Sequence, residues 1–133
     1  MSKLLLISVA ASLLVVGCRH EPSQATPELA YRTFVDFLQK GQARLAWNLL
    51  SAPTREKVTA KSKAIAEASK GQVRDEPETL LFQGSRPAAI TAINQVRADD
   101  STATLEVTSG TGTYEVKLVK DSGRWLVDLS DTL

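Results

Sequence analysis

Apolar positions in the first part of the predicted domain recur with the period of a helix. The segment opens with a capping hydroxyl, a proline and an acid, Thr26-Pro27-Glu28, and Gly41 ends it. Its core face consists of Ala30, Tyr31, Phe34, Val35, Phe37 and Leu38. A second, shorter helix is expected from about Gln42 to Leu50. Its apolar residues are Ala43, Leu45, Ala46, Trp47, Leu49 and Leu50.

A third helix is expected over residues 54–70, because Ser51-Ala52-Pro53-Thr54 breaks the second helix and Gly71 supplies a cap. Its best core candidates are Val58, Ala64, Ile65 and Ala68. Its other side is cationic, with Arg55, Lys57, Lys61, Lys63 and Lys70 outnumbering Glu56 and Glu67. We favour a solvated helix face; the alternative is a surface that rests on anionic headgroups near a membrane.

The period changes from helical to two after the turn Gly84-Ser85-Arg86-Pro87. Before this turn, Leu80-Leu81-Phe82 predicts one helical turn or an apolar lid. A first strand is indicated by Ile90, Ala92, Ile93 and Val96, and the later strands by the inward positions Ala103, Leu105, Val107, Tyr114, Val116, Leu118, Trp125, Val127 and Leu129. Turn residues separate these runs. We therefore predict an α+β domain, with N-terminal helices packed on one face of a curved, four-stranded antiparallel meander.

The first eighteen residues have a different pattern, in which a lone lysine precedes an apolar run and the only cysteine. Lys3 and the amino terminus form a positive region, and residues 4–16 form the apolar run. As a helix this run would reach only about 20 Å, which is too short for a hydrocarbon core of about 30 Å. Val15-Val16-Gly17-Cys18 resembles the bacterial lipobox. We therefore expect a lipoprotein signal peptide and a diacylglycerol on the thiol of Cys18.

This interpretation divides the chain into a signal peptide over 1–17, a lipidated cysteine and tether over 18–25, and a domain over 26–133. Two or more acyl chains hold a protein stably on a membrane, so we expect attachment to the cell envelope. Arg19 stands where an aspartate would favour the inner membrane, so the outer membrane is the expected location. The alternatives are an ordinary secretory signal that ends near a cysteine, and a buried structural cysteine.

Composition narrows the classes of function. The chain has 16 basic and 15 acidic residues, a balance that argues against a dedicated nucleic-acid binder. A single cysteine cannot form an intramolecular disulfide, and the only histidine, His20, lies in the expected tether. We therefore expect no cofactor and no metal site. Residues 19–70 carry nine Lys/Arg and five Asp/Glu, whereas residues 71–133 carry six and ten, so the first half is basic and the second acidic.

Three stretches of the domain resemble the nuclear transport factor two-like superfamily, which has a cystatin-like α+β fold. They are Thr26–Leu38, Gly41–Ser51 and Tyr114–Leu129, and the similarity covers about residues 26–130. More narrowly, they resemble bacterial lipoproteins of unknown function that carry such a domain. The resemblance implies a cone in which a curved sheet and helices enclose a cavity. Relatives use this cavity for small-molecule binding, for catalysis or for protein contacts.

Enzymatic relatives place a carboxylate, a histidine or a tyrosine inside the cavity. Here the inward strand positions hold one hydroxyl, that of Tyr114, and no charge. Neither Tyr114 nor Tyr31 has an acid–base partner in sequence, Asp128 is expected to point outward, and Asp99-Asp100 to cap backbone amides rather than bind a metal. We therefore expect no catalytic residue. The candidates for lining a ligand pocket are Tyr31, Phe34, Trp47, Phe82, Tyr114 and Trp125.

These observations favour a membrane-anchored envelope lipoprotein with a non-catalytic domain for protein interaction or scaffolding. The alternative is a binder of a small apolar ligand or lipid, in a cavity beneath Leu80-Leu81-Phe82. An enzyme is the least favoured of the three hypotheses. The expected partners are the membrane, through the N-terminal lipid, and an envelope protein.

Replacing Cys18 by alanine tests the lipid anchor. The wild-type protein should incorporate radiolabelled palmitate in its own cells, whereas the Cys18→Ala protein should not, because the thiol that receives the diacylglycerol is gone. Undiminished labelling of the variant would contradict the lipoprotein interpretation.

Overall fold

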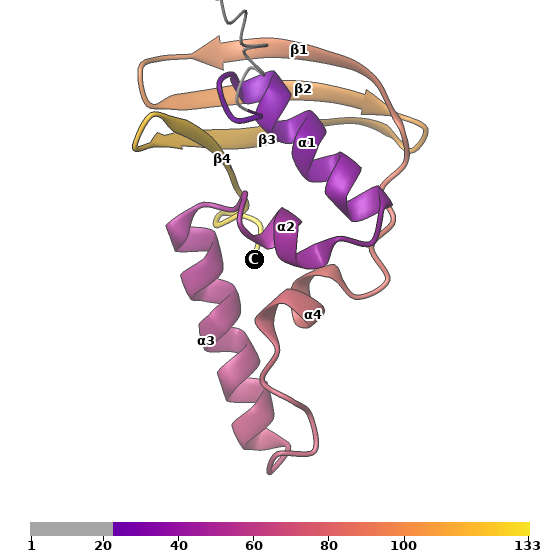
Figure 1. Cartoon of the computed structure of the whole chain (residues 1–133), viewed down its shortest axis with the longest axis vertical. Coiled ribbons are helices and arrows are strands. Elements are labelled where there is room, and N and C mark those ends of the chain that lie inside the picture. Colours follow the sequence, from indigo (N-terminus) through magenta and orange to yellow (C-terminus); the bar gives the residue numbers. More distant parts are fainter. Residues whose placement is uncertain (1–22) are drawn as a thin grey trace, which may run out of the picture.

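The computed structural model describes residues 23–133, so Cys18 and the expected signal peptide lie outside the described residues. Within that range, helices come first and strands follow (Figure 1). The helices are α1 (Pro27–Gln39), α2 (Ala43–Trp47), α3 (Ala52–Ala68) and α4 (Pro77–Phe82). The strands are β1 (Ile90–Ala98), β2 (Thr102–Ser109), β3 (Gly112–Asp121) and β4 (Arg124–Asp128). They form one antiparallel sheet in the order β1-β2-β3-β4, which confirms the α+β meander.

The hydrophobic core lies between α1 and one face of the sheet, and α2 and α4 close it at one end (Figure 1). Seven of the nine inward strand positions are buried: Ala103, Leu105, Val107, Val116, Leu118, Trp125 and Val127. Leu129 is half-buried and packs against the same core. Tyr114 is the exception, because its side chain lies close to the β2–β3 turn and remains 37% exposed. The period of two therefore identified the buried face of the sheet correctly.

α1 begins and ends where its sequence predicts. The Thr26 hydroxyl accepts a hydrogen bond from the Leu29 amide at 3.1 Å, and Gly41 follows the helix with a φ of +70°. The polar side is stabilised by the pairs Glu28–Arg32 and Asp36–Lys40, four residues apart. The buried face consists of Ala30, Tyr31, Phe34, Val35 and Leu38, with Phe37 partly buried.

α2 is shorter than expected, because the chain after it pairs with the sheet. The helix ends at Trp47, not at Leu50. Leu50 instead forms a parallel bridge with Val127. The Ser51 amide donates to the Val127 carbonyl at 2.9 Å, and the Val127 amide donates to the Leu49 carbonyl at 2.8 Å. This short segment covers the free edge of β4 and leaves Leu50 fully buried, whereas Leu45 is 44% exposed.

The core candidates of the third helix were mostly wrong. α3 begins at Ala52, two residues earlier than expected, with Ser51 as its cap. Ala64 and Ala68 are exposed and Ile65 is only half-buried. The buried residues are Thr54, Val58 and Ser62, a narrow stripe at four-residue spacing. The reason is that α3 extends away from the sheet and packs chiefly against α4, so only this stripe meets another element (Figure 1).

The first strand is also more exposed than its apolar residues suggested. β1 is an edge strand, and its register with β2 shifts between Ile90 and Ala92 and again between Gln95 and Arg97. Only Ile90 and Ile93 pack partly against the core, while Ala92 is exposed. Val96 lies within the second irregularity and is 49% exposed.

The burial of Leu50 predicts that the segment between α2 and α3 is essential to stability. Leu50→Ala should lower the free energy of unfolding by about 2–5 kcal/mol, because it leaves a cavity beside β4. Leu45→Ala, the same change at an exposed position of α2, should cost less than about 1 kcal/mol. Urea unfolding of both proteins measures the difference. Equal losses would show that Leu50 is not the buried contact described.

Candidate functional site

Four of the six pocket candidates form a chain of contacts through the core. The hydroxyl oxygens of Tyr31 and Tyr114 lie 3.0 Å apart. The rings of Tyr31 and Phe34 are 6.1 Å apart, and those of Phe34 and Phe82 are 5.9 Å apart, between centroids. The chain joins β3, α1 and α4. Phe34 and Phe82 are buried, so these side chains occupy space in which the expected cavity would lie.

The tyrosine pair has the properties of a packing contact. Burial raises the pKa of Tyr31 far above its usual range, and the hydrogen bond to Tyr114 raises it further. The hydroxyl of Tyr31 therefore stays protonated at any physiological pH. Tyr114, which was expected in the core, instead lies at its rim. Each hydroxyl is the side-chain hydrogen-bond partner of the other within the described part of the chain.

The two tryptophans have separate surroundings. Trp125 is buried in the core, and Lys120 Nζ lies 5.7 Å from the centroid of its ring. The backbone amide of Trp125 donates to the Gln24 carbonyl at 3.0 Å, so the first described residues lie along β4. Trp47 is half-buried and lines a groove against the outer side of α3. The structure therefore does not bring all six candidates around one pocket.

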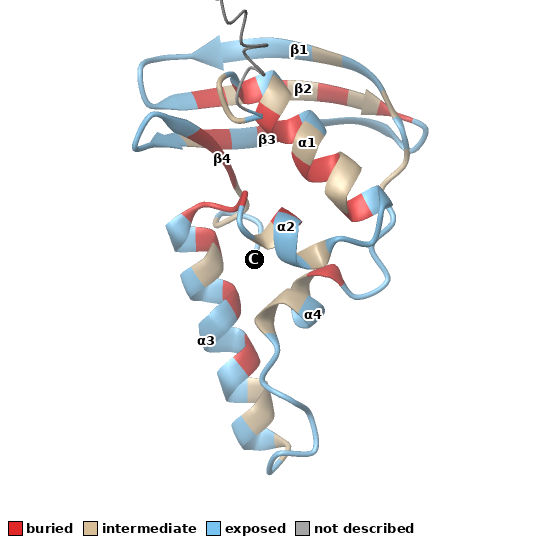
Figure 2. Cartoon of the chain, viewed as in Figure 1, coloured by how far each residue is buried: buried red, intermediate tan, exposed pale blue. Residues whose placement is uncertain are grey.

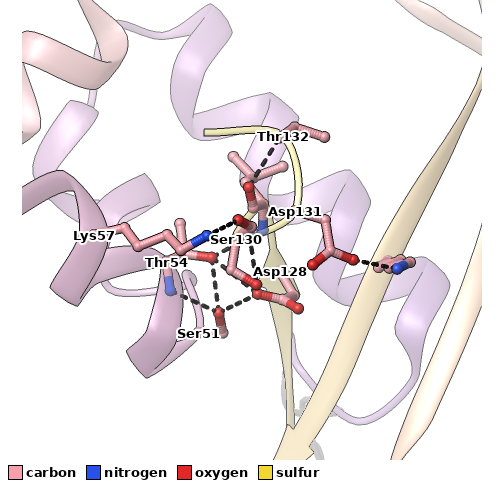
Figure 3. A network of polar contacts seen from close by, with 9 residues as sticks. Ser51, Thr54, Lys57, Asp128, Ser130, Asp131 and Thr132 are labelled. Atoms are coloured by element: carbon pink, nitrogen blue, oxygen red, sulfur yellow. Dashed lines mark hydrogen bonds and ion pairs between the residues drawn. The ribbon is translucent and has the colours of Figure 1, made fainter.

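A polar cluster that the sequence analysis missed joins the start of α3 to the end of β4 (Figure 3). Asp128 Oδ1 accepts hydrogen bonds from Ser51 Oγ at 2.7 Å and from Thr54 Oγ1 at 3.0 Å. Thr54 Oγ1 in turn accepts from the Leu129 amide at 2.8 Å. Ser51 and Thr54 are buried. Asp128, which was expected to point outward, is half-buried and faces two buried hydroxyls.

The charge of Asp128 is stabilised by this cluster. Burial acts to raise the pKa of the carboxyl group, but the hydrogen bonds from Ser51, Ser130 and Thr54 outweigh it and lower the pKa below its usual value. Nearby, Lys57 Nζ donates to the Ser130 carbonyl at 2.6 Å and holds the C-terminal segment against α3 (Figure 3). Ser51 and Thr54 have the spacing of a helix cap and its third residue, but the sequence does not show that Asp128 meets them.

α3 and the loop that follows it form a projection, residues 52–76, that we call the arm. Most of α3 is exposed around its circumference (Figure 2). α4 packs against α3, and Ser62 Oγ donates to Asp75 Oδ1, in the loop before α4, at 2.6 Å. A small pocket of about 140 Å³ lies between the two helices, with Ile65, Val73 and Leu80 among its walls. The arm is therefore held at its base by the polar cluster and farther along α3 by α4.

The cations of α3 do not form a single face. Lys57 is bonded to the Ser130 carbonyl. Arg55 and Lys63 line the groove beside Trp47, together with Glu56. Lys61 lies roughly on the opposite flank of the helix from Lys63, because two residues correspond to about 200°. The expected basic surface is thus divided into two flanks.

In the turn between β1 and β2, Asp99 caps backbone amides, as predicted. Asp99 Oδ1 accepts from the backbone amides of Ser101 at 2.9 Å and Thr102 at 2.8 Å. These hydrogen bonds lower the pKa of Asp99 to about 2. Within residues 23–133, no group of three or more His, Cys, Asp or Glu side chains is placed to hold a metal.

Comparison with known proteins adds no relative. No protein-family profile matches the chain, and no curated protein matches it in sequence. In the part of the chain that the structure describes, no helix has both the length and the hydropathy that crossing a membrane requires. The assignment of a function therefore depends on the geometry.

Asp128→Asn should destabilise the protein by about 1–2 kcal/mol at pH 7, because it weakens the hydrogen bonds to two buried hydroxyls. The pKa of Asp128 is lower in the folded state, so the stabilisation is complete above the unfolded value of about 4 and is lost as the pH falls through the folded value. The stability difference between wild type and variant should narrow below about pH 4 in urea titrations.

Asp131→Asn is the matched control for this experiment. Asp131 also lies near the C-terminus but forms only an exposed ion pair with Lys117, so its replacement should change stability little at any pH. A pH-independent effect of Asp128→Asn would contradict the role given to its charge.

Proposed function

We propose that this chain is a lipid-anchored protein of the bacterial envelope, whose domain presents the arm for contact with another protein. In this proposal the domain is a nuclear transport factor two-like cone, and the anchor is a lipid on Cys18. The α+β architecture of helices on an antiparallel sheet supports the family. The projection of the arm away from the expected anchor supports contact with another protein as the function.

The arm and the expected anchor lie at opposite ends of the domain. The first described residues lie beside the sheet, next to Trp125, whereas the far end of α3 lies at the other end of the long axis (Figure 1). Gln24 is hydrogen-bonded to Trp125, so only residues 18–23 of the expected tether are left to reach the membrane, and they would span at most about 21 Å. α3 alone is about 26 Å long. This arrangement points the arm away from the membrane and gives no support to α3 as a headgroup-binding surface.

The exposure of α3 is the single observation that carries the proposal. A helix of 17 residues with only Thr54, Val58 and Ser62 buried adds little apolar surface to the core. A helix that is polar around most of its circumference is one form in which a segment bridges between domains. Val73 in the loop after α3 is 48% exposed and Leu80 in α4 is 37% exposed, and both line the pocket between α3 and α4.

The alternative, a small-ligand binder, receives less support from the geometry. Its candidate residues Phe34, Phe82 and Trp125 are buried against other side chains of the same core. The two pockets beside α3, of about 140 and 520 Å³, are lined by other residues, apart from Trp47. We therefore retain protein interaction as the proposed function.

Site-specific photo-crosslinking in the protein's own cells tests the proposal. Benzoylphenylalanine in place of Ala64, an exposed residue of α3, should give a discrete cross-linked product of higher mass. The same probe in place of Thr113, exposed on the opposite face of the sheet, should not. Absence of a product from Ala64, or identical products from both positions, would contradict the arm as the interaction element.

A further inference from the structure

The side of α3 next to Trp47 carries a groove that takes no part in the hydrogen bonds and ion pairs described so far. It runs beside Trp47 along the first three turns of α3 and has a volume of about 520 Å³. Three of its lining residues are small: Ala52, Thr59 and Ala60. Small side chains let another backbone approach α3 closely. The indole of Trp47, which is half-buried, supplies an apolar wall.

The groove contains two cations and one anion, Glu56. Neither Arg55 nor Lys63 forms an ion pair with another residue of the described chain. Arg55 Nε is shielded from solvent and has no hydrogen-bond acceptor among the described residues. A shielded N–H without an acceptor is unfavourable, so the guanidinium gains by turning toward an oxygen anion that enters the groove.

The spacing of the two cations sets the shape of a matching ligand. Arg55 and Lys63 are eight residues apart on one helix, which corresponds to about 12 Å along its axis. Two carboxylates seven or eight residues apart on a second helix have a similar spacing. A shallow groove lined by small residues leaves one side of any ligand open. Such a groove therefore fits a helix better than it fits a small molecule.

We propose that the groove of Trp47, Arg55 and Lys63 binds an acidic amphipathic helix of a partner protein, with one carboxylate on each cation and an apolar side chain against the indole. This inference rests on the proposed function, because it names the chemistry of the partner that the arm contacts. The partner helix is acidic in this proposal because the groove carries two cations, Arg55 and Lys63, and only one anion, Glu56. The arm's direction away from the expected anchor favours a protein over the headgroups of the protein's own membrane.

Peptide binding tests this inference on the full-length protein, purified from its membranes in a neutral detergent. The probe is a fluorescein-labelled helical peptide of about 18 residues with two glutamates eight positions apart and a leucine beside the first. The comparison peptide has glutamine in place of both glutamates. Wild-type protein should bind the glutamate peptide at least about fivefold more tightly, as measured by fluorescence anisotropy.

Three variants locate the binding to the groove. Arg55→Gln and Lys63→Gln should each weaken binding of the glutamate peptide by about fivefold, because each removes one charge partner. Lys61→Gln, on the other flank of the same helix, should change it by less than about twofold. Circular dichroism verifies that each variant is folded, and the exposed position of Lys63 makes its variant the safer of the two.

The inference fails if wild-type protein does not distinguish the two peptides, or if Lys61→Gln weakens binding as much as Lys63→Gln does, since diffuse charge then explains the attraction. It also fails if phosphatidylglycerol vesicles, and not the peptide, bind in a manner that requires Arg55 and Lys63. A cross-link from Ala64 that persists unchanged in the Arg55→Gln, Lys63→Gln double variant would leave the proposed function standing and overturn only the groove.

Discussion

The hydrogen bonds that Asp128 accepts from Ser51 and Thr54 tie the base of α3 to the sheet, and α4 packs against the helix beyond it. α3 buries too little apolar surface to be oriented by hydrophobic packing alone. Its first turn is instead tied to the end of β4 by two buried hydroxyls on one carboxylate, and the backbone bridge between Leu50 and Val127 aligns the chain just before it. Polar contacts of this kind are directional, so they fix an angle where apolar contacts alone would leave it loose.

This constraint separates the molecule into a filled core and an exposed arm. The core is occupied by side chains of α1, α2, α4 and three strands, and the ring of Phe34 packs against those of Tyr31 and Phe82. The surfaces that remain free to meet other molecules are therefore on the outside. Among the helices, α3 offers the largest of them, since most of its circumference faces solvent (Figure 2).

Much of the fold could be predicted because its signals are local. The Thr26 cap, the Asp99 turn and the period of two in β2 to β4 each depend on residues a few positions apart. The direction of α3 could not be predicted, because the base of the helix is tied to the sheet by Ser51 and Asp128, which are 77 positions apart. The same limit explains the exposed Ala64 and Ala68 in α3: helical period identifies a face, but only tertiary structure decides which part of that face another element covers.

A distance measurement across the molecule tests the central claim, that the polar cluster orients the arm. With Cys18 replaced by serine, spin labels at Ala68 on α3 and Glu115 on β3, both exposed, report the separation of arm and sheet by double electron–electron resonance. We predict one narrow distance distribution, which broadens when Ser51→Ala and Thr54→Val remove both hydroxyls from Asp128. An equally narrow distribution in the double variant would show that the arm is oriented by something other than this cluster.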